Sequence, residues 1–87
     1  MLKIGSRIKI SENYHWAKNA IGTISEPPEI IVELSDNWKD NVRTIQSLKG
    51  ILHFYWIKFD EPQIDSADDG PYHEAEIDSA FLEQFEG

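Results

Sequence analysis

Positions 51–59 have the sequence Ile-Leu-His-Phe-Tyr-Trp-Ile-Lys-Phe, the longest apolar run in the chain. Such a run, rich in β-branched and aromatic side chains, is typical of a β-strand. Alternation along a strand places Tyr55 and Ile57 on one face and Phe54 and Trp56 on the other. Because both faces are largely apolar, the sequence predicts a central strand that needs cover on both sides.

Other segments also have strand patterns. Residues 5–10 alternate apolar with charged or polar side chains, which predicts a half-buried strand. Residues 20–25 and 72–77 predict two more strands, and Asp60-Glu61-Pro62 predicts a turn after the central one. Gly22 interrupts the alternation of its segment, which indicates a β-bulge or a close approach of two backbones.

The last part of the chain predicts a short closing element. Asp78 is placed to cap a single helical turn over residues 78–82. Leu82 and Phe85 are then expected to complete the core.

Residues 29–48 allow two interpretations. The first is a short extended piece followed by one or two helical turns within about residues 37–47, capped by Ser35 or Asp36. The second is a β-hairpin around Asp36-Asn37. The apolar residues of the segment recur at helical spacing: Ile31, Leu34, Trp38, Val42, Ile45 and Leu48. In either case one side is apolar, and we expect it to dock on Phe54 and Trp56.

Length and composition predict one small soluble domain spanning residues 1–87. The chain is 40% hydrophobic and 28% charged and contains no cysteine, which excludes disulfides and thiolate chemistry. The N-terminus has no apolar signal region, and no run approaches the roughly 20 apolar residues of a membrane span. We therefore expect a cytoplasmic protein without a membrane span.

The net charge of −8 is unevenly distributed. Residues 1–59 hold all 8 Lys and Arg and 6 of the 16 acidic residues, whereas residues 60–87 hold the other 10 acidic residues. Because nucleic-acid binding needs clustered cations, this asymmetry disfavours a nucleic-acid partner, including the role of a KOW- or Tudor-like reader. It favours a partner with a basic surface, although it can also serve solubility alone.

The order of these segments resembles the SH3-like small β-barrels, and within them the photosystem I reaction-centre subunit IV family of electron-transport accessory proteins. The resemblance lies in residues 5–10, Tyr14, Trp16, residues 21–24, residues 57–60, residues 75–77 and Leu82. It implies a mainly β fold: a five-stranded barrel with an inserted segment at about 29–48 and a long acidic loop at 61–71. It also implies a docking module that carries no cofactor.

Enzyme motifs are missing from the sequence. There is no Gly-rich phosphate loop, no Gly-x-Ser-x-Gly and no close histidine pair, so we expect no catalysis and no cofactor. His15, His53 and His73 are suitable zinc ligands by type, but their spacing indicates no zinc site.

The acidic loop has part of a calcium-binding pattern. With Asp65 at position 1 of an EF-hand loop, Asp69, Gly70 and Glu76 occupy positions 5, 6 and 12, but Ala67 stands at position 3. A looser site would use Asp65, Asp68 and Asp69, with Glu76 as a further ligand. The alternative is a solvated turn.

The main candidate site combines aromatic rings with carboxylates. Its predicted partner-binding residues are Glu12, Tyr14, Trp16, Tyr55, Tyr72, Asp65, Asp68 and Asp69. Such rings can bind extended peptides while the acids engage Lys or Arg. The same rings can instead fill the core and plug its ends. Phe54 and Trp56 form a second candidate surface if the 29–48 segment leaves them exposed.

These observations predict a non-enzymatic docking module for a basic protein or peptide. One alternative is a small acidic antagonist, an immunity or inhibitor protein that neutralises a basic toxin or a nucleic-acid enzyme. A calcium-binding loop module is the third.

Overall fold

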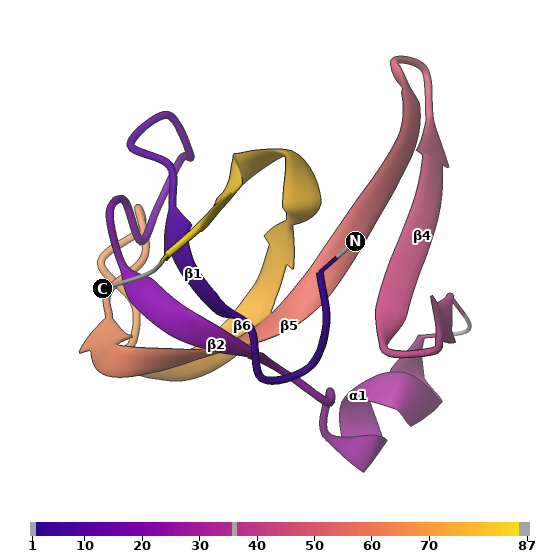
Figure 1. The fold of residues 1–87 in the computed structure, drawn as a ribbon, viewed down its shortest axis with the longest axis horizontal. Helices are drawn as coiled ribbons and strands as arrows, with labels where there is room; N and C mark the ends of the chain where they lie inside the picture. The colour runs from indigo at the N-terminus through magenta and orange to yellow at the C-terminus, as the bar shows by residue number, and fades with distance from the viewer. Residues whose placement is uncertain (1, 36, 86–87) are drawn as a thin grey trace.

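The predicted central strand is the hub of an antiparallel sheet. The computed structural model describes residues 2–35 and 37–85, and there the strand β5 runs from Gly50 to Gln63. Along one of its edges β5 pairs first with β4 (Val42–Ser47) and then with β2 (Ile21–Ser25). Along the other edge it pairs with β6 (Tyr72–Asp78) (Figure 1).

The remaining strands extend the sheet on both sides. β1 (Arg7–Ile10) pairs with β2 and with β7 (Leu82–Gln84), and β3 (Trp38–Lys39) pairs with β4. The described residues therefore form a mainly β, seven-stranded antiparallel sheet of order β3-β4-β5-β2-β1-β7, with β6 beside β5. The sheet has two strands more than the expected five, because β3 and β4 form within the inserted segment at 29–48. Hydrogen bonds between the described residues do not close the sheet into a barrel.

The core lies where the sheet curls over itself. Its fully buried side chains are isoleucines from β1, β2, β5 and β6: Ile8, Ile10, Ile24, Ile57 and Ile77. Gly22 makes the close approach that the sequence indicated, because a Cβ there would lie 2.6 Å from the carbonyl oxygen of Lys58. Only glycine lets β2 and β5 come this close.

The turn predicted at residues 60–62 is wrong. β5 continues through these residues to Gln63, with an irregular register between Lys58 and Gln63 where it faces β6. The extension ends where Gln63 pairs with Tyr72 of β6. At its start, Arg7 Nη1 donates to Asp60 Oδ1 at 2.7 Å and to Thr23 Oγ1 at 2.9 Å. The acidic loop proper thus begins after β5, at residue 64.

Both interpretations of residues 29–48 are corrected. The helix α1 spans Glu29–Leu34, where an extended piece was expected, and Pro28 stands at its N-cap. The predicted helix over 37–47 is instead β3 and β4, and the hairpin turn between them lies at Asp40-Asn41 rather than at Asp36-Asn37. Asp36 itself lies outside the described residues.

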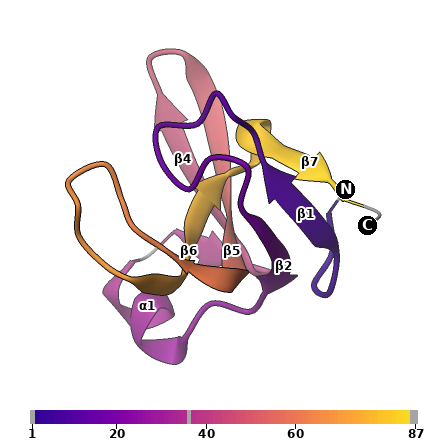
Figure 2. The same ribbon diagram turned by 90° about the vertical axis from the view of Figure 1, so that its left-hand side faces the viewer.

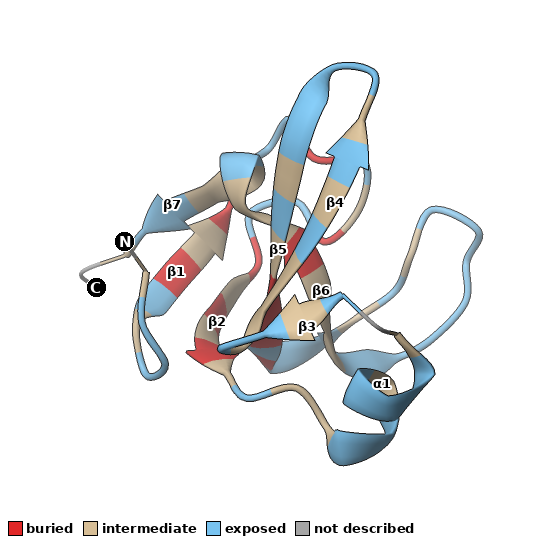
Figure 3. Ribbon diagram, turned by 90° about the vertical axis from the view of Figure 1, so that its right-hand side faces the viewer, coloured by how far each residue is buried: buried red, intermediate tan, exposed pale blue. Residues whose placement is uncertain are grey.

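The hairpin of β4 and β5 projects from the rest of the molecule (Figures 1 and 3). Near its tip, Leu48 is fully exposed and Ile51 is 62% exposed. The expected cover on both faces of the central strand is therefore present only over its second half, where Tyr55 through Ile57 and Phe59 are buried.

The capped turn of the closing element is confirmed. Asp78 accepts a hydrogen bond from the backbone N–H of Ala80 at 3.0 Å and caps a 3₁₀ turn over Ser79–Phe81. Leu82 packs against the core as expected. Phe85 is half-buried and does not belong to the core cluster of the described residues, and its backbone N–H donates to Arg7 O at 3.1 Å. Among the described residues no helix is long and apolar enough to cross a membrane.

Candidate functional site

Three of the predicted binding residues converge on one pocket. Trp16 from the first loop, Asp65 from the acidic loop and Tyr72 from β6 line a pocket of about 270 Å³, together with His15, Ser66 and Ala75. We call these six residues the aromatic pocket. Figure 2 shows the first loop and the acidic loop beside β6, which brings these distant parts of the sequence together.

The two large rings of the aromatic pocket are held by packing. The Trp16 ring lies 5.7 Å, centroid to centroid, from both Phe59 and Tyr72, at interplanar angles of 85° and 74°. Such edge-to-face contacts are favourable for aromatic rings. Two backbone hydrogen bonds position the ends of the first loop. Ser11 N–H donates to Phe81 O at 2.8 Å, and Asn19 N–H donates to Ile10 O at 2.9 Å.

The acidic side of the pocket is a hydrogen-bonded turn. Asp65 Oδ1 accepts from the backbone N–H of Ala67 and of Asp69, both at 2.9 Å. Asp68 N–H donates to Asp65 O at 3.0 Å. This Asx-type turn fixes where the Asp65 carboxylate sits next to the rings.

Electrostatics link the turn to the aromatic ring. The negative charge of Asp65, reinforced by partial burial and by Asp69, raises the pKa of the Tyr72 phenol above its ordinary value of 10.0. A field that disfavours a phenolate stabilises a cation at the same place.

Tyr14 and Tyr55 belong to the core, at 7% and 9% exposure. Tyr14 packs on Phe81 with ring centroids 4.9 Å apart. Glu12, Asp68 and Asp69 are exposed and lie outside the aromatic pocket's lining.

The second candidate surface is covered by the chain itself. Trp56 is 8% exposed and meets Trp38 at a centroid distance of 6.4 Å. Arg43 lies 5.8 Å from the centre of the half-buried Phe54 ring and donates to Glu76 Oε1 at 2.7 Å. The 29–48 segment thus docks here, as expected.

That docking leaves a second hollow on β6, which we call the α1 hollow. It has a volume of about 450 Å³ and lies between α1, β3 and the outer face of β5 and β6. Its apolar lining comes from Ile31, Leu34, Trp38 and Trp56. The sequence signal is the apolar stripe Ile31, Leu34 and Trp38, of which Ile31 and Leu34 lie in α1 and Trp38 lies in β3.

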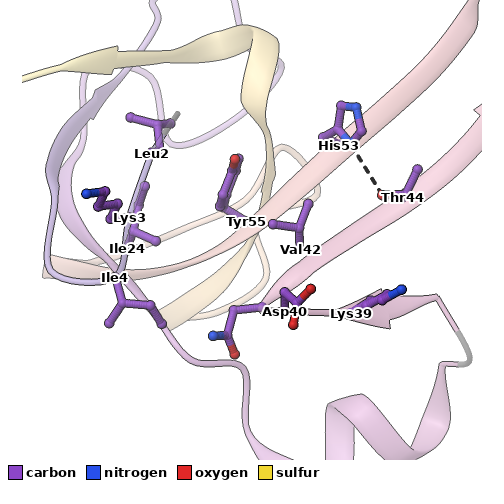
Figure 4. A pocket seen from close by; sticks show the side chains of 11 residues that line it. Leu2, Lys3, Ile4, Ile24, Lys39, Asp40, Val42, Thr44, His53 and Tyr55 are labelled. Carbon is purple, nitrogen blue, oxygen red and sulfur yellow. Dashed lines mark hydrogen bonds between the residues drawn. The ribbon is translucent and has the colours of Figure 1, made fainter.

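A groove larger than either of these lies elsewhere (Figure 4). It has a volume of about 540 Å³ and separates the N-terminal residues Leu2–Ile4 from the β3–β4 turn. Its lining includes the buried or half-buried Ile24, Val42 and Tyr55. It also includes the exposed Lys3, Lys39 and Asp40. Of the predicted partner-binding residues it contains Tyr55.

Metal binding finds no support in the geometry. Within residues 2–35 and 37–85, no three His, Asp or Glu side chains gather closely enough to hold an ion. Glu76 is bound to Arg43, and Asp65 Oδ1 is occupied by backbone amides. The calcium prediction for Asp65, Asp68, Asp69 and Glu76 remains without a structural argument.

The aromatic pocket contains the residue types of a hydrolytic triad without its connections. His15, Ser66 and Asp65 all line it, but within the described part of the chain no hydrogen bond links them to one another. A triad is defined by such a relay and not by composition, so these residue types alone do not identify one.

Comparisons with family models, curated proteins and solved structures found no significant match to this chain. The resemblance to photosystem I subunit IV therefore remains a prediction from the sequence.

Proposed function

We propose that this chain is a non-enzymatic docking module that takes a Lys or Arg side chain of a basic partner protein into the aromatic pocket. One observation carries the proposal: Trp16 and Tyr72, distant in sequence, meet at 5.7 Å beside Asp65. Ring faces and a carboxylate together attract a cation, with about 0.5–2 kcal/mol from each cation–π contact.

The size and surroundings of the pocket support this proposal. A volume of about 270 Å³ is below the roughly 300–1,000 Å³ of small-molecule sites and suits a single side chain. Residues 60–87 carry 10 acids and no Lys or Arg. Although Arg7 and Arg43 pair with Asp60 and Glu76, the acidic loop keeps Asp68 and Asp69 exposed.

We further propose that strands β6-β5-β2-β1-β7 form an SH3-like small barrel. They follow one another as antiparallel neighbours, and a 3₁₀ turn joins β6 to β7. In this proposal α1, β3 and β4 are the insertion, and the aromatic pocket lies beside the first loop.

The experiment is a titration with fluorescent peptides that are identical except for one Lys, Arg, Gln or Glu. The Lys and Arg peptides should bind and the other two should not. Asp65→Asn removes the charge but keeps an oxygen for the Asx turn, so it should weaken binding about two- to fivefold, which corresponds to roughly 0.5–1 kcal/mol.

Asp40→Asn is the matched control, because it makes the same charge change in the distant β3–β4 turn, where Asp40 has φ 53° and asparagine is well tolerated. If Asp65→Asn and Asp40→Asn change the peptide affinity equally, the peptide does not bind in the aromatic pocket. If binding also survived Trp16→Phe and Tyr72→Leu, simple charge attraction would explain it, as the antagonist alternative requires.

A further inference from the structure

The free edge of β6 lies between the two hollows. β6 pairs with β5 and, in the described part of the chain, with no other strand. Tyr72 and Ala75 line both the aromatic pocket and the α1 hollow. The strand is therefore the wall that separates them, and its free edge runs between their openings.

Hydrogen bonds show which backbone groups face this edge. Asp78 N–H donates to the hydroxyl of Tyr14 at 3.5 Å, away from β5. Since backbone groups alternate sides along a strand, Glu76 and Glu74 direct their N–H and C=O groups the same way.

The neighbouring strands give the same alternation independently. Ile24 N–H donates to Ser6 O at 2.9 Å, on the side of β1, so it is Thr23 and Ser25 that bond to their partners Lys58 and Trp56 on β5. β5 must then direct Ile57 toward Ala75 on β6. This leaves Glu74 and Glu76 facing outward, and no backbone hydrogen bond from another described segment reaches them there.

The chemistry of the two hollows differs. The aromatic pocket offers rings and the Asp65 carboxylate to a cation. In the α1 hollow, Glu74 already accepts from Trp56 Nε1 at 2.8 Å and Glu76 is bound to Arg43. Its remaining surface, from Ile31, Leu34 and Trp38, suits an apolar side chain.

We propose that the free edge of β6 accepts an extended segment of the basic partner as an added strand. This inference rests on the proposed function and specifies the form of the ligand. Successive side chains of an added strand point to opposite faces. One Lys or Arg therefore enters the aromatic pocket, and an adjacent large apolar residue enters the α1 hollow. Carboxylates along β6 and the acidic loop match the cation.

The test is a backbone N-methylation scan of a short peptide containing Lys-Leu flanked by Thr residues. Each methyl group removes one N–H donor and leaves the side chains intact. Binding should fall about tenfold at every second position, where the N–H faces β6, and much less at positions between. If N-methylation weakens binding equally at every position, or at none, the peptide does not bind as an added strand.

Amide exchange provides a second readout. On peptide binding, the Glu74 and Glu76 amides should exchange at least about tenfold more slowly, whereas the Asp78 amide, already bonded to Tyr14, should change less. Unchanged Glu74 and Glu76 exchange in a saturated complex would also contradict the proposal.

The α1 hollow has its own variant. Leu34 is 78% exposed, so Leu34→Ser should fold normally. It should weaken binding of the Lys-Leu peptide but not of a Lys-Ser peptide.

If Asp65→Asn weakens binding while the methylation scan shows no alternation between successive positions, the docking function stands and the added strand fails. If the Lys-Leu peptide does not bind at all, both proposals fail.

Discussion

The indole N–H of Trp56 donates to Oε1 of Glu74 at 2.8 Å, whereas the indole N–H of its neighbour Trp38 is buried without a partner among the described residues. Two tryptophans in edge contact thus differ in hydrogen bonding. Trp56→Phe should lower the free energy of unfolding by about 1–2 kcal/mol beyond the loss of ring area, because a bond to a charged group disappears.

Trp38→Phe is the comparison. It removes a donor that makes no bond to the described residues, so the gain from losing an unsatisfied group offsets part of the lost packing. Urea unfolding should show a clearly smaller cost than for Trp56→Phe. Equal costs would mean that the Trp56–Glu74 bond contributes little to stability.

Gly22 predicts a steric effect on stability. An added Cβ would lie 2.6 Å from Lys58 O and 2.7 Å from Ile57 Cγ2, so β2 and β5 must separate. We expect Gly22→Ala to cost about 1–3 kcal/mol in chemical unfolding. Ser25→Ala in the same strand is the control and should cost much less, because the bond of Ser25 Oγ within the described residues is a local one, to Glu26 O. A stable Gly22→Ala protein would contradict the close approach.

The raised pKa of Tyr72 can be measured directly. Because the charge of Asp65 is its largest cause, Asp65→Asn should lower the Tyr72 pKa toward 10.0, while Asp40→Asn should leave it unchanged. An NMR titration of labelled tyrosine rings reports this value. Because the Tyr72 pKa is higher in the folded than in the unfolded protein, Tyr72 contributes stability that is present below about pH 10. This contribution is lost as the pH rises through the folded pKa, and Asp65→Asn should make the loss smaller.

Asp60 should show the opposite shift. Its hydrogen bonds to Arg7, and the charge of Arg7, lower the Asp60 pKa from the ordinary 3.8. Asp60 therefore contributes stability that is present above its pKa in the unfolded chain and is lost as the pH falls through its pKa in the folded protein. Arg7→Gln should return the Asp60 pKa to its ordinary range in a carboxyl NMR titration. No change would show that the pair does not persist in solution.

Segments with an unambiguous pattern could be predicted from the sequence. The alternation before Ile10 and the apolar run around Ile57 identified β1 and β5, and Gly22 identified the close contact of β2 with β5. These features depend mainly on neighbouring residues. The turn expected at Pro62 failed because pairing with β6 resumes at Gln63, opposite Tyr72, and this non-local partner is not visible in the local sequence.

Residues 29–48 could not be assigned for a similar reason. Their apolar spacing fits a helix, but pairing with β5 through the tight turn at Leu48-Lys49 makes residues 42–47 a strand. Pro28 stands directly before α1, and proline is frequent at helix starts. For the site, Trp16, Asp65 and Tyr72 were predicted, but the α1 hollow depends on where α1 docks, which no local pattern encodes.

The position of β5 at the centre of the sheet has a kinetic consequence. Its hairpin with β4 closes through a local two-residue turn, and such hairpins form within about 1–10 μs. Its pairings with β2 and β6 require distant parts of the chain to meet, which slows folding toward the millisecond range or beyond, roughly as in other sheets built from non-local pairs. We therefore expect the most exposed part of the domain to form earliest, and the isoleucine core to assemble last.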